Sequence, residues 1–427
     1  MTLQAILWNI MSDVTLWFDV SDLVRHHGAW TGIQRVVASF ATGLQDCRDP
    51  FALRYCYFQR ERGFVAMDAP AVEDLIGGLH QVRDKPKRGW LDKLNALVRS
   101  TPTAYGDPFR PADLLMNLGL YTYKEEWRPV VAEILARKRI RYVGFVHDLM
   151  HADFPEWWSP REQTRIVGWY RFVFRHAATL ICASAATRND TERFLVTEKL
   201  PQVPIVTTGL AGTLFPPPES ALSLAVGTGP IEPPYVLFVS TLETRKNHRL
   251  LFYLWRRLRE RLGDARLPTL LLVGKKGHLI DDLLTELDNC RYLDGKIRWL
   301  QRVTDTALAW LYRHSLFTVY PSLYEGWGLP VAESLAFGKY CIAANSGALP
   351  EVGGAFLDYH DPLDLPFALD LVTRAIVDPA YVAVKEAEIA RAYRPLSWQE
   401  CARAATTGLA SLPLFQEEQV ISVDSLV

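Results

Sequence analysis

Short apolar segments alternate with helical patterns along nearly the whole 427-residue sequence. Each segment is continuously apolar, which is typical of strands buried on both faces of a parallel sheet. The helical patterns between them supply the crossovers that parallel strands require. The pattern therefore predicts an α/β fold. The expected strands are Thr15–Val20, Leu53–Phe58, Leu114–Leu118, Tyr142–His147, Leu180–Ala183, Ile205–Thr207, Tyr235–Ser240, Thr269–Gly274, Ile297–Leu300, Phe317–Tyr320 and Tyr340–Ala344.

A Pro- and Gly-rich stretch interrupts this pattern near the middle of the chain. It includes Phe215-Pro-Pro-Pro and Glu232-Pro-Pro, a composition typical of linkers. The chain is also too long for one ordinary core. We therefore expect two Rossmann-like doubly wound domains, 1–214 and 235–395, joined by a linker at 215–234. Residues 396–427 would form a helix that crosses back to the first domain, followed by a tail.

Composition excludes several classes of protein. The net charge of -1 gives no global attraction to nucleic acid. Six scattered cysteines without a C-x-x-C pair argue against a zinc site or a disulfide framework, and fit a reducing compartment. The N-terminus lacks a convincing signal peptide, and no apolar run is long enough to span a bilayer. We expect a cytoplasmic protein.

The segment from Glu325 to Pro330 (Glu-Gly-Trp-Gly-Leu-Pro) follows an expected strand and precedes an expected helix, Val331–Phe337. Gly326 and Gly328 allow a ligand to approach the backbone closely. Free N–H groups at a helix start favour an anion such as a diphosphate. Ligands of doubly wound sheets bind at the carboxyl ends of the strands, which is where this loop lies.

Glu325 on the loop and Glu333 in the expected first helical turn are eight residues apart. Together they could accept hydrogen bonds from the hydroxyls of a hexose and a ribose. Alternatively, Glu333 only favours the helix dipole and Glu325 is a solvated loop acid.

In this context the sequence resembles glycosyltransferase family 4, whose retaining enzymes carry a Glu-x7-Glu motif and the GT-B fold, two such domains facing each other across a cleft. Further segments extend the resemblance in the expected order: Ser240–His248 looks like the donor-phosphate loop, Leu272–Gly277 follows the next strand, and Asn345–Val352 follows the motif helix. The resemblance implies a retaining transferase that works without a metal or other cofactor. It also implies that the departing phosphate oxygen acts as the base.

The resemblance assigns roles to individual residues. Lys246 would contact the donor diphosphate, Glu325 the transferred sugar and Glu333 the ribose. The remaining donor-binding residues would be Arg245, Gly326, Gly328, Leu329, Gly274 and Lys275, with the backbone N–H groups near Gly328 and Leu329 on the phosphates.

One departure affects the diphosphate site. Many family members carry an arginine just after the glycine that ends the first strand of this domain, and Thr241 stands there instead. Arg245 is the nearest substitute, although it could equally be a surface residue.

In the first half, Gly32 and Arg35 match a Gly-x-x-Arg turn that the family places near the phosphates or the acceptor. A tight turn before a surface helix explains them about as well. His147 and Asp148 end an expected strand, where the family's histidine contacts the transferred sugar. A lone histidine is otherwise more often structural. Ser184 and Thr187 predict a structural helix N-cap.

Residues 85–99 place Trp90 and Leu94 on one helical face with lysines and arginines around it. This is typical of a helix on an anionic lipid surface, or of an ordinary amphipathic helix packed on a core. The first interpretation would place the protein at the inner face of the plasma membrane.

The segment Thr31-Gly-Ile-Gln-Arg-Val36 resembles the corresponding start of bacterial mannosyl- and rhamnosyltransferases of surface-polysaccharide synthesis. The first expectation is therefore a hexosyltransferase that moves mannose from GDP-mannose to a glycan or lipid-linked oligosaccharide. Alternatives are a rhamnosyl- or glucosyltransferase using a dTDP- or UDP-sugar, a sugar-nucleotide epimerase or phosphorylase on the same scaffold, and a binding protein without activity.

Overall fold

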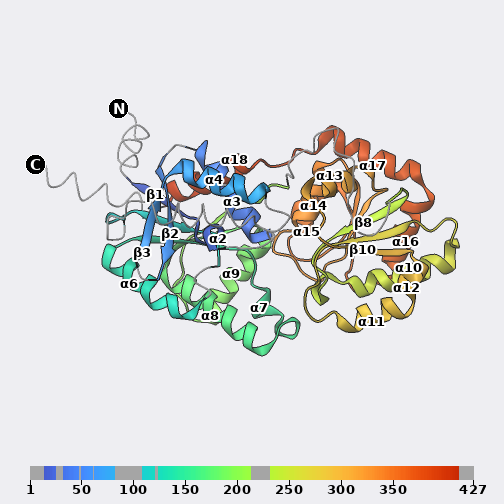
Figure 1. Ribbon diagram of the computed structural model, residues 1–427, viewed down its shortest axis with the longest axis horizontal. Helices are drawn as coiled ribbons and strands as arrows, with labels where there is room; N and C mark the ends of the chain where they lie inside the picture. The colour runs from blue at the N-terminus through green and yellow to red at the C-terminus, as the bar shows by residue number, and fades with distance from the viewer. Residues whose placement is uncertain are drawn as a thin grey trace, which may run out of the picture. The chain divides into compact units, whose positions relative to one another are not determined.

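A computed structural model describes residues 14–25, 32–47, 50–60, 62–81, 108–120, 124–212 and 231–412. The chain divides into two compact units (Figure 1). The first comprises residues 1–210 with 397–427, and the second residues 211–396. The segments 85–99 and 413–427, and the linker up to residue 230, lie outside the described residues. No helix in the described ranges is both long enough and apolar enough to cross a membrane.

The first unit contains a seven-stranded sheet in the order β3-β2-β1-β4-β5-β6-β7. Its strands are parallel except for β3, which pairs antiparallel with β2 at the edge. The strands are β1 (Thr15–Asp19), β2 (Ala52–Gln59), β3 (Gly63–Met67), β4 (Leu114–Asn117), β5 (Arg141–Val146), β6 (Ala177–Cys182) and β7 (Ile205–Thr207).

The helices of this unit connect and cover the strands. They are α2 (Ser21–Arg25), α3 (Gly32–Gln45), α4 (Ala69–Gln81), η2 (Glu125–Trp127), α6 (Arg128–Lys138), α7 (Met150–Asp153), η3 (Pro155–Trp157), α8 (Pro160–His176), α9 (Ala185–Thr197) and α18 (Trp398–Ala410). Ser184 caps α9 by accepting a hydrogen bond from Thr187 N at 2.9 Å, which confirms the predicted N-cap.

The C-terminal helix α18 packs within the first unit, beside α3 (Figure 1). A capping box between Ser397 and Glu400 begins the helix. Gly43 of α3 lies so close to α18 that a Cβ on it would be 2.4 Å from Trp398 O. A Cβ on Gly408 of α18 would be 2.5 Å from Val206 Cγ1 of β7. The last described helix therefore packs in the first unit, against α3 and β7.

The second unit contains a six-stranded parallel sheet in the order β10-β9-β8-β11-β12-β13. The strands are β8 (Tyr235–Val239), β9 (Thr269–Val273), β10 (Ile297–Leu300), β11 (Thr318–Tyr320), β12 (Cys341–Ala344) and β13 (Asp358–His360). The helices are η4 (Thr244–Lys246), α10 (His248–Leu262), α11 (Asp281–Asn289), α12 (Arg291–Asp294), α13 (Asp305–His314), α14 (Leu329–Ala336), α15 (Leu349–Gly353), η5 (Gly354–Phe356), α16 (Leu365–Val377) and α17 (Pro379–Ala392).

Successive residues of β8 enter different cores. Val236 and Phe238 join the cluster that includes α10 and α11, whereas Tyr235 and Leu237 join the cluster that includes α13. Burial of both faces explains why these strands are continuously apolar. The predicted fold class, α/β with two doubly wound sheets, is confirmed.

Two strands were not predicted. β3 (Gly63–Met67) is a short antiparallel edge strand, and β13 (Asp358–His360) is a three-residue edge strand with polar ends. Edge strands are buried less completely, so neither produces a long apolar run. The structure also ends β8 and β9 one residue before Ser240 and Gly274, which places both residues in loops.

Candidate active site

The loop that carries Glu325 leaves the carboxyl end of β11 and enters α14. Gly328 precedes the helix with a φ of 106°, a left-handed conformation that favours glycine. Pro330 lies in the first turn, where its missing N–H breaks no helical hydrogen bond. A Cβ on Gly347 would lie 2.3 Å from the carbonyl oxygen of Glu325, and Ala348 N donates to that oxygen at 2.9 Å. These contacts fix the backbone at Glu325.

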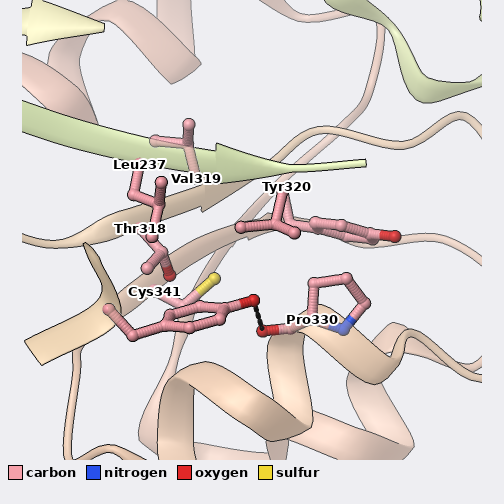
Figure 2. A pocket seen from close by; sticks show the side chains of 8 residues that line it. Leu237, Thr318, Val319, Tyr320, Pro330 and Cys341 are labelled. Atoms are coloured by element: carbon pink, nitrogen blue, oxygen red, sulfur yellow. Dashed lines mark hydrogen bonds between the residues drawn. The ribbon is translucent and has the colours of Figure 1, made fainter. Parts of the chain in front are cut away.

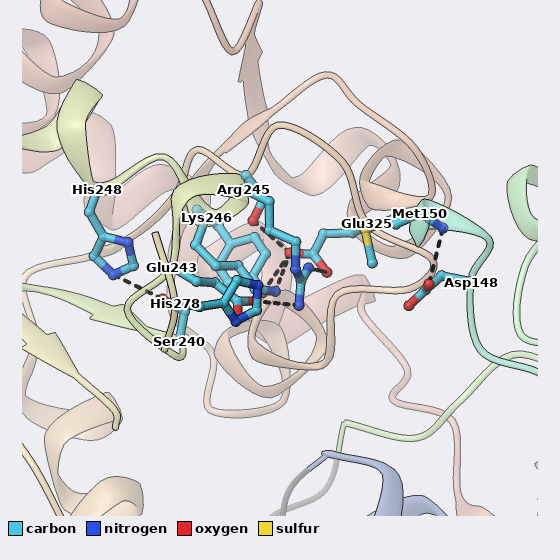
Figure 3. A network of polar contacts seen from close by, with 11 residues as sticks. Asp148, Met150, Ser240, Glu243, Arg245, Lys246, His248, His278 and Glu325 are labelled. Atoms are coloured by element: carbon cyan, nitrogen blue, oxygen red, sulfur yellow. Dashed lines mark hydrogen bonds and ion pairs between the residues drawn. The ribbon is translucent and has the colours of Figure 1, made fainter. Parts of the chain in front are cut away.

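Glu325 is a buried carboxylate, not a solvated loop acid, with 6% of its surface exposed. Its Oε1 accepts hydrogen bonds from the hydroxyls of Tyr320 (3.2 Å) and Ser322 (2.6 Å). The same oxygen accepts from the Lys246 ammonium, and Oε2 lies 3.5 Å from Arg245 Nη1 (Figure 3). Burial raises the pKa of Glu325, but the charges of Lys246 and Arg245 outweigh burial and hold the pKa below its ordinary value. The group is therefore ionised at neutral pH.

Lys246 ends η4 in the loop after β8, and its side chain is almost fully buried. The ammonium donates to Tyr320 Oη at 3.1 Å as well as to Glu325. A buried ammonium requires such partners, because an unpaired charge in the interior is costly. The structure therefore brings together two residues that the sequence assigns to the diphosphate and to the sugar.

Asn247 connects the loop after β8 to two other strand-end loops. It adopts a left-handed conformation, with a φ of 60°. Its Nδ2 donates to the carbonyl oxygens of Pro321 (3.1 Å) and Pro362 (2.8 Å). Leu323 N also donates to Arg245 O at 2.8 Å. These bonds hold the carboxyl ends of β8 and β11 in a fixed relation within this unit.

Arg245 lies in the same charged cluster and is not a surface residue, since only 16% of its side chain is exposed. Its Nη2 lies 2.7 Å from Glu243 Oε1, and Glu243 Oε2 lies 3.9 Å from His278 Nδ1. Glu243 is a buried acid that was not predicted to belong to the site. The available signal was an acidic residue two positions before two adjacent cations.

Glu333 lies in α14, but not in the first turn as expected, because the helix begins at Leu329 and not at Val331. A helix-dipole role at the first turn therefore does not apply. Glu333 is buried, and its Oε2 accepts a hydrogen bond from Tyr312 Oη at 2.8 Å. Tyr312, on α13, is a second residue of the site that was not predicted.

A narrow hollow lies between the sheet and α14 (Figure 2). Tyr312 lines it, and its hydroxyl donates to Pro330 O at 3.4 Å. The lining is mostly apolar: Leu237, Val239, Tyr312, Thr318, Val319, Tyr320, Pro330 and Cys341. None of these side chains is charged, so the hollow adds no charged group to the Glu325 loop.

Gly274 marks a close contact between two strand-end loops. A Cβ at Gly274 would lie 1.9 Å from Ser240 O, so no larger residue fits without displacing the backbone. Trp299 Nε1 donates to Gly274 O at 2.8 Å from the neighbouring strand β10. Lys275, the next predicted donor-binding residue, is exposed at the strand end.

In the first unit, β5 ends at Val146, one residue before the expected strand end, and His147 and Asp148 follow it. The Nε2 of His147 lies 2.7 Å from Leu118 O, and burial lowers the pKa of the imidazole. Asp148 Oδ1 accepts a hydrogen bond from Met150 N at 3.2 Å. Gly32 begins α3, and Arg35 lies half-buried in its first turn.

A polar network at the ends of β1 and β4 was not predicted. The carboxylate of Asp19 is buried and accepts hydrogen bonds from Ser21 N (2.9 Å) and Asn117 Nδ2 (3.2 Å). Tyr142 Oη donates to Asn117 Oδ1 at 3.3 Å. The network orders the carboxyl edge of this sheet, where β5 also ends.

The described residues contain no group of three or more His, Cys, Asp or Glu side chains placed to hold a metal ion. All six cysteines lie in these residues and are free.

Two solved structures of other proteins are similar to this chain over nearly its whole length. The chain resembles the solved Anabaena protein HepE in complex with UDP and glucose, with 17% identity, a TM-score of 0.58, and coverage of 93% of this chain and 100% of that one. It also resembles sucrose-phosphate synthase from Thermosynechococcus elongatus, with 17% identity, a TM-score of 0.57, and coverage of 97% and 99%. These likenesses confirm the GT-B fold.

Residues 227–356 match the family model described as Glycosyl transferases group 1. This segment contains Lys246, Glu325 and Glu333. The chain thus carries a group 1 glycosyltransferase domain in these residues, in agreement with the resemblance that the sequence shows.

Curated relatives are similar over part of their length. O-antigen chain mannosyltransferase B of Escherichia coli is 33% identical over 167 residues, which cover 39% of this chain and 43% of that protein. A serotype-specific mannosyltransferase WbdA of Escherichia coli is 29% identical over 206 residues, covering 44% of this chain and 24% of that protein. The chain therefore matches less than half the length of each.

Proposed function

We propose that the protein is a retaining hexosyltransferase that moves mannose from GDP-mannose to a glycan or lipid-linked oligosaccharide in surface-polysaccharide synthesis. The observation that carries this proposal is the buried cluster of Lys246, Arg245 and Glu325 at the carboxyl ends of β8 and β11. Ligands of doubly wound sheets bind at this edge. The mannosyltransferases named above support the choice of sugar.

Within this proposal the cations bind the donor diphosphate. Lys246 is the first cation, and Arg245 supplies the second, which Thr241 cannot provide. The N–H groups near Gly328 and Leu329 complete the anion site at the start of α14. Positive charge fixed at this position stabilises the negative charge that develops on the leaving nucleotide. Gly274 and Gly326 allow the backbone to approach the donor, and Lys275 adds positive charge nearby.

The two carboxylates hold hydroxyls on opposite ends of the donor. Glu325 binds the transferred sugar, and Glu333 binds the ribose in the orientation set by Tyr312. His147 contacts the transferred sugar, and Gly32, Arg35 and Asp148 act on the phosphates or the acceptor, as the family resemblance implies. The departing phosphate oxygen takes the acceptor proton, so the new bond forms on the face that the nucleotide leaves. No metal or other cofactor enters this scheme.

The first experiment is a thermal-shift panel with GDP, UDP, dTDP and ADP. A ligand at 100 times its dissociation constant stabilises a folded protein by about 2.7 kcal/mol. We expect GDP to give the largest shift, in buffer containing EDTA as well as in buffer with Mg²⁺. A larger shift with UDP would instead favour a glucosyltransferase, for which the fold neighbour solved with UDP and glucose is a precedent. No shift with any nucleotide would contradict the proposal.

We also propose that the protein works at the cytoplasmic face of the plasma membrane, because a lipid-linked acceptor would lie there. The basic and apolar segment 85–99 would contact anionic lipid. Co-sedimentation with vesicles containing phosphatidylglycerol tests this. Replacing the basic residues Lys85, Lys87, Arg88 and Lys93 with glutamine should abolish co-sedimentation, and unchanged binding would contradict the membrane role.

A further inference from the structure

The charged cluster of the second unit balances its own charge. Two cations, Arg245 and Lys246, face two carboxylates, Glu243 and Glu325 (Figure 3). The exposed fractions of the four side chains are only 16%, 9%, 8% and 8% in that order. Because little water reaches these groups, each depends on its partner for compensation.

The bonds around Glu325 leave little capacity for further ligands. One oxygen, Oε1, already accepts from Lys246, Tyr320 and Ser322, and the other faces Arg245. A carboxylate oxygen has about two lone-pair sites. A sugar hydroxyl can therefore bind Oε1 only if one of its three present donors leaves. Of those three donors, Lys246 is the one that the proposed function directs elsewhere.

We infer that donor binding exchanges the partners of the ion pair between Lys246 and Glu325. The diphosphate replaces the Glu325 carboxylate on the Lys246 ammonium, and the sugar hydroxyls replace the ammonium on the carboxylate. Glu325 thus acts as the counter-ion of the empty site before it acts on the sugar. This inference rests on the proposed function and adds a binding role for Glu325 in the absence of donor.

The exchange of partners should make the site bind the sugar-nucleotide donor and the nucleoside diphosphate product with different affinities. An intact sugar nucleotide supplies new partners to both Lys246 and Glu325. A nucleoside diphosphate supplies partners only to Lys246 and, in the proposed function, to Arg245. It leaves the Glu325 carboxylate buried with the neutral donors Tyr320 and Ser322. Since an uncompensated buried charge is costly, the product should bind less tightly than its diphosphate contacts alone would allow. The carboxylate therefore favours product release.

The test uses Glu325→Gln in the full-length protein, with GDP and GDP-mannose titrated by calorimetry. The variant keeps the shape of the side chain but has no charge to exchange. We expect its affinity for GDP to rise by about tenfold, while its affinity for GDP-mannose rises less or falls. The control is Ser322→Ala, which removes a neutral donor from the same oxygen and should not change the ratio of the two affinities by more than about twofold.

Unchanged or weaker binding of GDP by Glu325→Gln would overturn the exchange. If that variant does not fold, Glu325→Asp is titrated in its place, because the shorter side chain withdraws the carboxylate from Lys246. Glu325→Asp should also bind GDP more tightly than the wild type does. Equal affinity of the two proteins for GDP would overturn the inference. Failure of the wild type to bind both GDP and UDP would contradict the proposed function itself.

Discussion

Tyr312 on α13 donates a hydrogen bond to the buried carboxylate of Glu333 on α14, with 2.8 Å between Oη and Oε2. The two residues are far apart in sequence, and the bond crosses from one helix to the next. Under the proposed function this hydroxyl sets the orientation of the ribose-binding carboxylate.

Replacing Tyr312 with phenylalanine should therefore raise KM for the sugar nucleotide more than it changes kcat. The loss of a hydrogen bond to a buried carboxylate should also lower the free energy of unfolding by about 1–3 kcal/mol. Tyr235→Phe is the matched control, because it removes a buried hydroxyl that donates to Leu311 O at 2.9 Å in the same unit. An equal change of KM in both variants, measured by steady-state kinetics, would contradict the ribose role.

Replacing Arg245 with alanine should weaken binding of the nucleoside diphosphate by about 1.5–3 kcal/mol, because a charge-assisted hydrogen bond to a phosphate is lost. Calorimetric titration measures the change. Arg257→Ala is the control, since its side chain is 62% exposed on α10 and pairs with Glu260. Wild-type affinity in Arg245→Ala would show that Arg245 does not replace the arginine missing at Thr241.

Acid should destabilise the wild type more than Glu325→Gln. The folded pKa of Glu325 lies below the ordinary value of 4.5, so its ionised form stabilises the folded state above that value. This contribution is lost as the pH falls through the folded pKa. Urea denaturation from neutral pH to below pH 4.5 should show the stability difference between the two proteins shrinking on acidification. A difference independent of pH would contradict the ionised state of Glu325.

Replacing Gly274 with alanine should destabilise the second unit and impair nucleotide binding, because the added Cβ would lie 1.9 Å from Ser240 O. Gly77→Ala is a control of opposite sign. It lies in α4 with no atom within 4 Å of the added Cβ, and alanine should stabilise the helix by up to about 1 kcal/mol. Thermal unfolding of both variants checks the pair, and a neutral effect of Gly274→Ala would refute the close contact.

The sequence sufficed for the general fold because strands buried on both faces produce continuous apolar runs. It also placed Glu325 and Lys246 on loops that follow strands, and the structure brings these side chains into direct contact. Tyr312 could not be placed in the same way, because its contact with Glu333 joins two helices and periodicity does not encode such a contact. Glu243 lies in the same loop as Lys246, but its pairing with Arg245 depends on side-chain conformation, which the loop sequence does not specify. The edge strand β3 was not predicted because its assignment depends on antiparallel pairing with β2, which the sequence pattern does not show.

The measurement that tests the central proposal most directly is the anomeric configuration of the transferred or hydrolysed sugar. GDP-α-D-mannose is incubated with the wild type and with Glu325→Gln, and the first product is observed by proton NMR before mutarotation. We expect the α-anomer from the wild type and no turnover by the variant. A β-anomer, or equal turnover by both proteins, would contradict a retaining hexosyltransferase that depends on Glu325.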